Sequence, residues 1–196
     1  MKNNILTDHT LIIDELETSL RIHKWNSILP FLPKGSYLVG GYIRDIILRR
    51  FNEKIDVDIV VPLDAIEIGK KISENIESKL IILDKKRKVV RIILNDIYID
   101  IDNQVSSTIE GDLSKRDLSI NSIAFLFEKK CLLDPFNGLK DLELSLLRTY
   151  SEENLLKDPL RILRCFRFVS ELHFQIDPKL ITFIKRNKEK LYLVAK

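Results

Sequence analysis

The chain has 196 residues, of which 45% are hydrophobic and 31% are charged, and its 32 basic residues nearly balance its 29 acidic residues. This length and composition suit one domain, or one compact domain with a helical appendage. A net charge of +3 excludes a uniformly basic nucleic-acid-binding chain, so any site for a polyanion must be local. No stretch has the length and apolar character of a signal peptide or a membrane span.

The first elements are predicted from hydrophobic periodicity and from turn residues. A period of about 3.6 residues predicts a helix over residues 8–29, ended by the prolines at 30 and 33. The elements expected next are a strand at 36–39, a helix at 41–50, a strand at 55–61 and a helix at 62–78.

Three further strands are expected at 79–84, 88–94 and 97–102. The charged tip from Asp84 to Lys88 is more typical of a solvated hairpin end than of an RNA contact. The remaining elements are a short helix between 112 and 121, a hairpin at 122–127 and 131–134, and helices at 139–147, 152–172 and 177–192. A mixed sheet followed only by helices indicates an α+β domain that leads into a helical neck.

The cysteines and histidines carry no recognisable chemistry. Cys131 and Cys165 lie in apolar surroundings outside any metal or redox motif, so we expect reduced core thiols and a cytoplasmic location. His9, His23 and His173 lie outside the motifs described below and are expected to be structural.

Carboxylates repeat along one predicted strand. Asp56 and Asp58 are two residues apart, so both side chains leave the same face of the sheet. Such a pair repels itself unless a cation lies between its members, and hard oxygen ligands suit Mg²⁺. Asp100 could add a third carboxylate if its strand lies beside 55–61, but Asp102 points to the same face, which leaves the choice open. Alone, the short pattern also describes the solvent face of a half-exposed sheet.

Two glycines precede these acids. Gly40 and Gly41 lie where a strand turns into a helix, and the missing Cβ atoms let a ligand approach the backbone. The free N–H groups at the start of that helix suit a triphosphate, and Arg44 is one turn further on. A turn alone would explain the glycines, but it does not explain the acids on the next strand.

The segment LVGGYIRDIILRR…DVDIVV resembles the signature of class II tRNA nucleotidyltransferases and bacterial poly(A) polymerases. Three later segments resemble further motifs of this family in the same order: EGDLSKRDLSINSIAF (110–125), DPFNGLKDLELSLLRT (134–149) and KDPLRILRCFRF (157–168). The resemblance implies a DNA polymerase beta-like head, α+β with a mixed sheet and flanking helices, followed by a helical neck. The expected divisions are an N-terminal helical segment at 1–35, the head at 36–150 and the neck at 151–196, truncated before body and tail domains.

The resemblance also implies roles for individual residues. Asp56 and Asp58 would hold the catalytic Mg²⁺ ions, with Asp100 as a further catalytic carboxylate. The remaining motif residues would bind the nucleotide: Gly40, Gly41, Arg44 and Arg116 at the triphosphate, Asp117 at the ribose, Asp45 and Asn121 beside them, and Asp158, Arg161, Arg164 and Arg167 on a nucleotide-selecting helix.

The spacing of the last group supports its role. Residues 158, 161, 164 and 167 recur every three positions, which predicts one inclined row on a helix. A guanidinium there could donate to N3 of cytosine or N1 of adenine, and a carboxylate could accept from the exocyclic amino group that both bases share. Uracil and guanine would leave both protein groups mispaired. A surface ladder of salt bridges is the alternative interpretation.

Three departures from the family pattern bear on function. Lys157 stands where an acid is frequent. The connection from Asp100 to Arg116 is short, as in family members that add only C, although some compact relatives add A. The chain ends before any RNA-binding body, which a partner chain could supply. We therefore expect an enzyme that adds C, A or both to the 3′ end of tRNA from CTP and ATP and binds tRNA weakly by itself. The alternatives are a non-catalytic nucleotide-binding module and a poly(A) polymerase.

Overall fold

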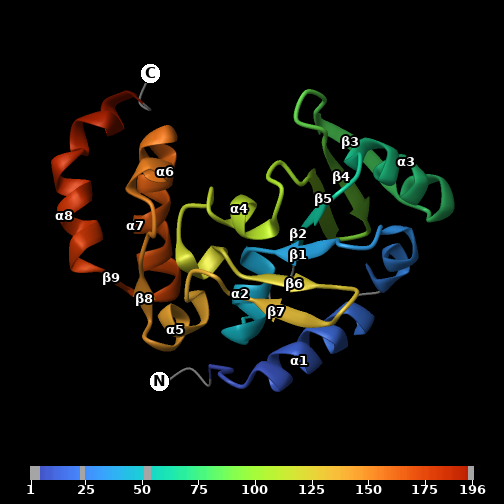
Figure 1. Ribbon diagram of the computed structural model, residues 1–196, viewed down its shortest axis with the longest axis horizontal. Helices are drawn as coiled ribbons and strands as arrows, with labels where there is room; N and C mark the ends of the chain where they lie inside the picture. Colours follow the sequence, from blue (N-terminus) through green and yellow to red (C-terminus); the bar gives the residue numbers. More distant parts are fainter. Residues whose placement is uncertain (1–4, 23–24, 51–53, 194–196) are drawn as a thin grey trace.

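The computed structural model describes residues 5–22, 25–50 and 54–193. Its centre is a seven-stranded mixed sheet in the order β3-β4-β5-β2-β1-β6-β7, in which only the β2–β5 pair is parallel (Figure 1). The strands are β1 (Tyr37–Val39), β2 (Ile55–Val61), β3 (Lys79–Asp84), β4 (Val89–Leu94), β5 (Ile97–Asn103), β6 (Ala124–Leu126) and β7 (Cys131–Leu133).

Helices cover the sheet unequally. Alternate residues of β2, namely Val57, Ile59 and Val61, point into the main core together with residues of α1, α2 and α3, while Val60 points to the other face, into a small cluster under α4. The helical elements up to this point are α1 (His9–Ile22), η1 (Trp25–Phe31), α2 (Gly41–Ile47), α3 (Ala65–Asn75), α4 (Ile109–Leu113), η2 (Ser119–Asn121) and α5 (Gly138–Glu143). Part of the second face is therefore free for a site.

The C-terminal helices lie at one side of the sheet, on the left in Figure 1. They are α6 (Glu152–Lys157), α7 (Leu160–Leu172), α8 (Pro178–Arg186) and η3 (Lys188–Leu193). A two-stranded parallel sheet, β8 (Leu146–Leu147) with β9 (Gln175–Ile176), joins the end of the head to the turn after α7. No helix in the described ranges is long and apolar enough to cross a membrane.

The strands match the sequence-based prediction closely, and most differences are in helices. The helix expected at 8–29 corresponds to α1 and the 3-10 helix η1, and residues 23–24 lie outside the described ranges. The helix expected within 112–121 begins earlier, because Thr108 caps α4 by accepting from the Gly111 N–H at 3.2 Å. The helix expected at 139–147 ends at Glu143, and the next residues turn to form β8.

The last two predicted helices are each divided. The helix expected at 152–172 breaks at Asp158, whose extended backbone (φ −143°, ψ 101°) follows from the proline at 159. The helix expected at 177–192 is α8 followed by η3.

The thiols and histidines fit the expected structural roles in part. Cys165 is buried, which raises the pKa of its thiol to about 12, whereas Cys131 is half-buried in β7, and both thiols are free. His9 is exposed at the start of α1, and His173 takes the left-handed conformation that ends α7. His23 lies outside the described residues.

The packing of α3 on the sheet gives a stability prediction. Ile72 is fully buried against the core, whereas Ile82 on the edge strand β3 is 45% exposed. Ile72→Ala should lower the free energy of unfolding by about 2–5 kcal/mol, because it removes buried methyl groups and leaves a cavity. The control Ile82→Ala should cost less than about 1 kcal/mol. Urea denaturation measures both, and equal losses would contradict this placement of the core.

Candidate active site

The predicted carboxylates lie on the partly free face of the sheet. Asp58 pairs in register with Asp100 on the neighbouring parallel strand, and Val60 pairs with Asp102. Because facing residues of neighbouring strands point to the same side, Asp56, Asp58, Asp100 and Asp102 share one face. The register therefore brings together acids that are more than forty residues apart in the chain.

Asp100 and Asp102 differ in their partners. Asp100 accepts a bidentate pair from Arg91, with Nε at 2.6 Å and Nη2 at 2.8 Å. Asp102 lines the same cleft as Asp58. Arg91 lies on β4 outside every motif, so its ion pair was not foreseen. The catalytic role expected for Asp100 stays a prediction, with Asp102 the acid that shares the cleft with Asp58.

The Asp58 carboxylate lies in an unfavourable setting for a charge. Although 44% of its side chain is exposed, nearby protein displaces water and raises the pKa of the carboxyl, and the charges of Asp100 and Asp56 raise it further. Arg116 opposes this effect, with Nη1 3.9 Å from Oδ2. A cation between Asp56 and Asp58 would relieve the remaining repulsion, and paired carboxylate oxygens suit Mg²⁺.

The donor set for a metal is small. Among the described residues, no three His, Cys, Asp or Glu side chains are grouped so as to hold a metal ion. Asp56 and Asp58 would therefore supply only part of a coordination shell. Mg²⁺ commonly binds one or two carboxylates and keeps its other positions for water and phosphate, so the pair fits that ion.

The glycine turn leads directly into this site. Gly40 has a φ of +83°, which side chains rarely adopt, and its N–H donates to the Ile123 carbonyl at 3.2 Å. A Cβ atom at Gly40 would lie 2.5 Å from Nη1 of Arg116 and 3.1 Å from Oδ2 of Asp58. The absence of a side chain therefore lets the Arg116 guanidinium lie against the turn beside the acids.

Arg44 is held in place by two neighbours. Its Nε and Nη2 each donate to Asp45 at 3.0 Å, and Nη1 donates to Oδ1 of Asn121 at 2.7 Å. Only 11% of the Arg44 side chain is exposed, and its guanidinium lies 4.9 Å from the Phe168 ring centre. These contacts orient Arg44 along the cleft wall, which it lines together with Asn121.

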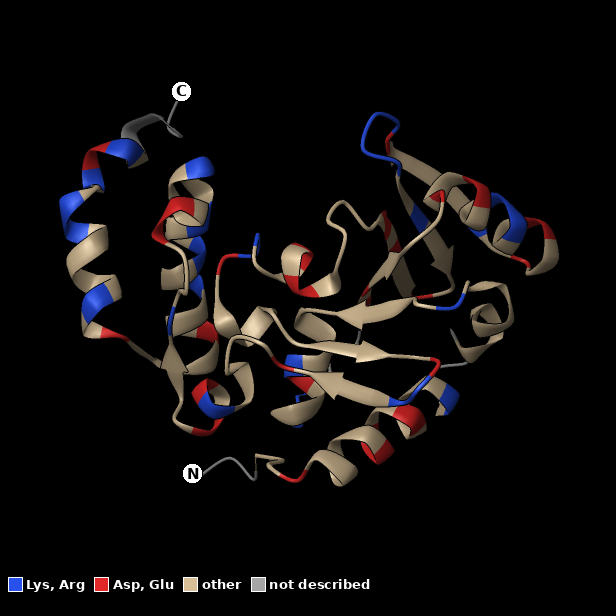
Figure 2. Ribbon diagram, viewed as in Figure 1, with Lys and Arg blue, Asp and Glu red and all other residues tan. Residues whose placement is uncertain are grey.

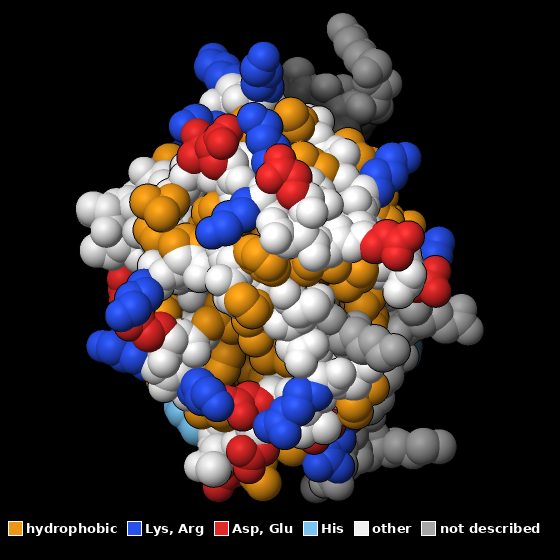
Figure 3. Space-filling view, turned by 90° about the vertical axis from the view of Figure 1, so that its right-hand side faces the viewer, with side chains coloured by type: hydrophobic (Ala, Val, Ile, Leu, Met, Phe, Trp, Pro, Cys, Tyr) orange, Lys and Arg blue, Asp and Glu red, His pale blue; other side chains and the backbone are white. Residues whose placement is uncertain are grey.

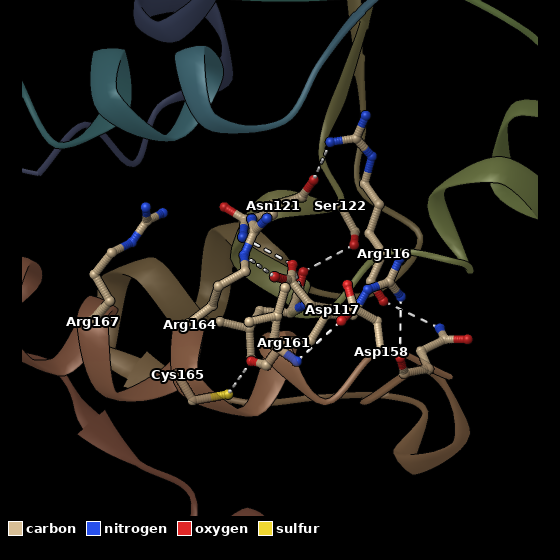
Figure 4. A network of polar contacts seen from close by, with 12 residues as sticks. Arg116, Asp117, Asn121, Ser122, Asp158, Arg161, Arg164, Cys165 and Arg167 are labelled. Atoms are coloured by element: carbon tan, nitrogen blue, oxygen red, sulfur yellow. Dashed lines mark hydrogen bonds and ion pairs between the residues drawn. The ribbon is translucent and has the colours of Figure 1, made fainter. Parts of the chain in front are cut away.

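Asp117 continues this network into the neck. Its Oδ1 accepts from Nδ2 of Asn121 at 3.1 Å, and its Oδ2 lies 2.8 Å from Nε of Arg164 on α7 (Figure 4). Asp117 is only 5% exposed. Its carboxylate orients Arg164, and the ribose contact expected for Asp117 stays a prediction.

The arginine row on α7 is only partly as expected. Arg161, Arg164 and Arg167 line the cleft, but Asp158 precedes the helix and caps it by accepting from the Leu160 N–H at 3.0 Å. The prediction that Asp158 lies on the helix was wrong, because the proline that follows keeps its backbone extended.

The arginines also have partners that the sequence did not reveal. Nη1 of Arg161 donates to the carbonyls of Lys115 at 2.7 Å and Asn154 at 3.1 Å, and Nε of Arg167 lies 3.4 Å from Glu171. Figure 4 shows Arg164 directed toward Asp117 and Arg167 directed away from that network. All three arginines are therefore paired with protein groups, and Asp158 and Arg161 make separate side-chain contacts.

Further residues support the site from outside the predicted set. Phe168, which is buried, has the guanidinium carbons of three arginines within 6 Å of its ring centre. Tyr150 and Asn154 both bond to the Arg116 carbonyl, at 3.0 and 3.1 Å, and so fix the backbone that carries the Arg116 side chain. Sequence spacing placed Phe168 one turn after Arg164, but no signal distinguished it from an ordinary core residue.

The cleft between the sheet face, α4 and α7 has a volume of about 420 Å³. Seven basic and four acidic side chains line it, so it suits a polyanion. The basic residues are Arg44, Arg87, Lys115, Arg116, Arg161, Arg164 and Arg167, and the acidic residues are Asp58, Asp102, Asp112 and Asp117.

Two other hollows differ in position. A smaller one of about 270 Å³ lies beside the cleft and is lined by Asp45, Asp56 and Asp58 among others. An apolar cavity of about 620 Å³ lies between α1, η1 and the β6–β7 hairpin, away from the acids. The chemistry expected from the sequence is thus concentrated in the cleft and the hollow next to it.

Comparison with known proteins places this chain in a family. A family model described as "Poly A polymerase head domain" matches residues 36–148. The chain belongs to this family. The match confirms the expected family and the α+β fold with its mixed sheet and flanking helices.

Individual relatives share this region. The CC-adding tRNA nucleotidyltransferase of Synechocystis sp. is 36% identical over 167 residues, which cover 85% of this chain and 40% of that protein. The A-adding tRNA nucleotidyltransferase of Deinococcus radiodurans is 35% identical over 151 residues, 77% of this chain and 34% of that protein. The chain spans about two fifths of the length of the relatives that it matches.

A solved structure is also similar to most of this chain. The Thermotoga maritima CCA-adding enzyme, complexed with tRNA, is similar with a TM-score of 0.73 and 34% identity. The similarity covers 82% of this chain and 39% of that chain.

The two glycines of the turn allow a matched test. Gly40→Ala should lower the free energy of unfolding by about 1–3 kcal/mol, because the backbone conformation is strained for alanine and the new methyl group would displace the Arg116 guanidinium. Gly41→Ala should cost little, since its Cβ would meet only the Arg44 side chain, at 3.5 Å. Thermal and urea unfolding compare the two variants, and equal stabilities would contradict the geometry described for the turn.

Proposed function

We propose that this chain is the catalytic head of a template-independent nucleotidyltransferase, which adds C, A or both to the 3′ end of tRNA from CTP and ATP. The observation that carries the proposal is the shared cleft, in which Asp58 lies opposite the arginines of α7. Relatives named as CC-adding and A-adding tRNA nucleotidyltransferases support the substrate class. In this cleft, a polyanion with a reactive phosphate would contact the basic side chains and the metal-binding acids simultaneously.

Each group of site residues has a separate role in the proposed reaction. Asp56 and Asp58 would hold Mg²⁺, which when bound stabilises the negative charge of the attacking oxygen and of the pyrophosphate leaving group. The Gly40 turn makes room for the Arg116 guanidinium beside Asp58, where it could donate to phosphate oxygens. Arg44, fixed by Asp45 and Asn121, contributes a positive charge that needs little reorganisation.

We assign base selection to the α7 side of the cleft. Arg161 and Arg164 present guanidinium donors there, and Asp158 lies just before the helix as an acceptor. These groups bond to protein atoms, and a bound base would have to replace those partners. Cytosine and adenine share one arrangement of hydrogen-bond donors and acceptors. Groups on this side of the cleft that match it would select these two bases without a nucleic-acid template.

The connection between β5 and α4 favours C addition. It spans only residues 104–108, and Asp112 accepts from the Val105 and Ser106 N–H groups at 2.9 and 2.8 Å. A short, pinned connection has little freedom to act as a lever that would reshape the site for a second base. Substitution of Asp100 and of Lys157 would test whether either residue takes part in the reaction.

The proposal includes an RNA-binding body and a location. The divisions at 36–150 and 151–196 correspond to head and neck, and a helical body, in the same or another chain, would grip the tRNA. We place the reaction in the cytoplasm, where the two free thiols would remain reduced. A non-catalytic nucleotide-binding module would bind CTP but release no pyrophosphate. A poly(A) polymerase would extend an RNA by many adenosines.

The acid pair gives the first test. Asp56→Asn and Asp58→Asn should each reduce nucleotide incorporation by at least about a hundredfold, since each removes a metal ligand. In the absence of metal, Asp58→Asn should fold at least as stably as the unmodified chain at neutral pH. The reason is that a raised carboxyl pKa means its ionised form destabilises the fold.

Incorporation of labelled CTP and ATP into tRNA lacking its 3′ terminus, together with Mg²⁺-dependent thermal shifts, measures both effects. Asp96→Asn, an exposed acid in the β4–β5 turn, is the control and should change neither. Wild-type incorporation by either site variant would show that the pair does not hold the catalytic metal.

The second test concerns the base. Titration calorimetry with the four nucleoside triphosphates in Mg²⁺ should show CTP, ATP or both binding about tenfold or more tightly than UTP and GTP. This factor corresponds to about 1.4 kcal/mol for base contacts of the kind described. Arg161→Ala should reduce the preference and leave a common, triphosphate-dominated affinity. Four equal affinities for the unmodified chain would rule out selection by protein side chains.

A further inference from the structure

The hairpin between β3 and β4 ends in four consecutive basic residues, Lys85 to Lys88, here called the basic tip. Two contacts fix its backbone and base. Oδ1 of Asp84 accepts from the Arg87 N–H at 2.9 Å, and Nζ of Lys88 lies 2.5 Å from Oδ2 of Asp64, the residue that caps α3. The tip is therefore a positioned feature of the fold and more than a solvated turn.

One residue of the basic tip has a strained backbone conformation. Lys88 has a φ of +57°, a left-handed conformation in which glycine or asparagine would be less costly. With lysine at this position, the turn keeps a side chain that ties it to α3. The lysines at 85 and 86 are exposed, and within the described ranges no ion pair is formed by them or by Arg87.

The tip lies on the rim of the candidate active site. Arg87 lines the same cleft as Asp58 and Arg164. Figure 2 shows the basic tip and the basic residues of α7 on opposite sides of α4 along the ribbon. Basic side chains also gather at the upper end of the face seen in Figure 3, and hydrophobic side chains occupy a hollow below them.

Such a concentration of charge attracts polyanions. Adjacent cations repel one another, and the chain as a whole has a net charge of only +3. A single nucleic-acid strand offers one negative charge per about 3.4 Å, so three free cations at the tip can meet two or three successive phosphates. An acidic protein segment could also supply charge, but it would have no reason to share the cleft with the nucleotide site.

We propose that the basic tip binds the phosphodiester backbone of the RNA whose 3′ end enters the cleft. This inference rests on the proposed function and adds to it an entry side and an orientation for the RNA strand. Lys85, Lys86 and Arg87 contact phosphates and read no base, so they set the position of the strand relative to Asp56 and Asp58. The neck arginines lie on the opposite side of α4.

The test uses the paired substitution Lys85→Ala/Lys86→Ala, with Lys70→Ala/Lys71→Ala as the matched control. The control removes two exposed lysines from α3, which covers the other face of the sheet. Circular dichroism and thermal unfolding verify that both variants fold. Filter binding with tRNA lacking its 3′ terminus is measured from 50 to 300 mM salt, with calorimetry for CTP and steady-state incorporation in parallel.

The slope of log K against log salt should become shallower by about 1.4 if the two lysines contact single-stranded phosphates, or by about 1.8 for duplex phosphates. KM for tRNA should rise by about tenfold, while kcat at saturating tRNA and the affinity for CTP stay unchanged. The control should reproduce the unmodified slope. An unchanged slope in the tip variant, or an equal change in the control, overturns the inference.

Two further measurements distinguish RNA binding at the tip from general anion binding and from catalysis. Polyglutamate is titrated as a second anion, and an equal loss of affinity for it would show a general anion surface and would overturn the assignment to RNA. If the unmodified chain binds tRNA with the expected tip dependence but incorporates no nucleotide, the tip assignment stands and the proposed catalytic function fails. Normal incorporation with no tip dependence would overturn the tip assignment and leave the catalytic function supported.

Discussion

The site depends on one buried carboxylate. Asp117 is almost fully removed from water, and its charge is compensated by Arg164 from the neck and by Asn121, which in turn accepts from Arg44. The Arg164 side chain is 48% exposed, so removing it would leave the buried charge of Asp117 as the uncompensated member of the pair. Through these contacts α2, η2 and α7, which are far apart in the chain, form one wall of the cleft. The aromatic ring of Phe168 completes this wall beneath the guanidinium groups.

The opposite wall of the cleft, formed by the sheet, carries closely spaced acids. The parallel pairing of β2 with β5 places acids side by side on a face that is not covered by the main core. Desolvation and mutual repulsion disfavour the charge on Asp58, and Arg116 reduces that cost only partly. A ligand that brings divalent cations to the acids and phosphates to the arginines satisfies both walls. Under the proposed function, a metal-bound nucleotide would replace contacts that the side chains of the cleft make with one another.

Two local backbone conformations help to shape the site. Gly40 adopts a conformation that leaves room for the Arg116 guanidinium, and the extended Asp158 ends α6 so that α7 can start in a new direction. In both cases the local sequence accounts for the conformation, through a missing Cβ atom at one site and a following proline at the other. The Tyr150 and Asn154 contacts then hold the Arg116 backbone from behind.

The sequence by itself determined the periodic elements and the identity of the charged groups. The alternation in β2 specified which side chains are buried and placed Asp56 and Asp58 on the other face, because side chains in a strand alternate with period two. The glycine turn and the arginine spacing likewise depend on local geometry.

Only the tertiary structure decided the partners. That Arg91 binds Asp100, that Asp117 holds Arg164 and that Arg87 reaches the cleft all depend on strand order and on how the neck packs. These contacts join residues distant in sequence, and a side chain's choice among several oppositely charged groups follows from distance and burial, which no local pattern encodes.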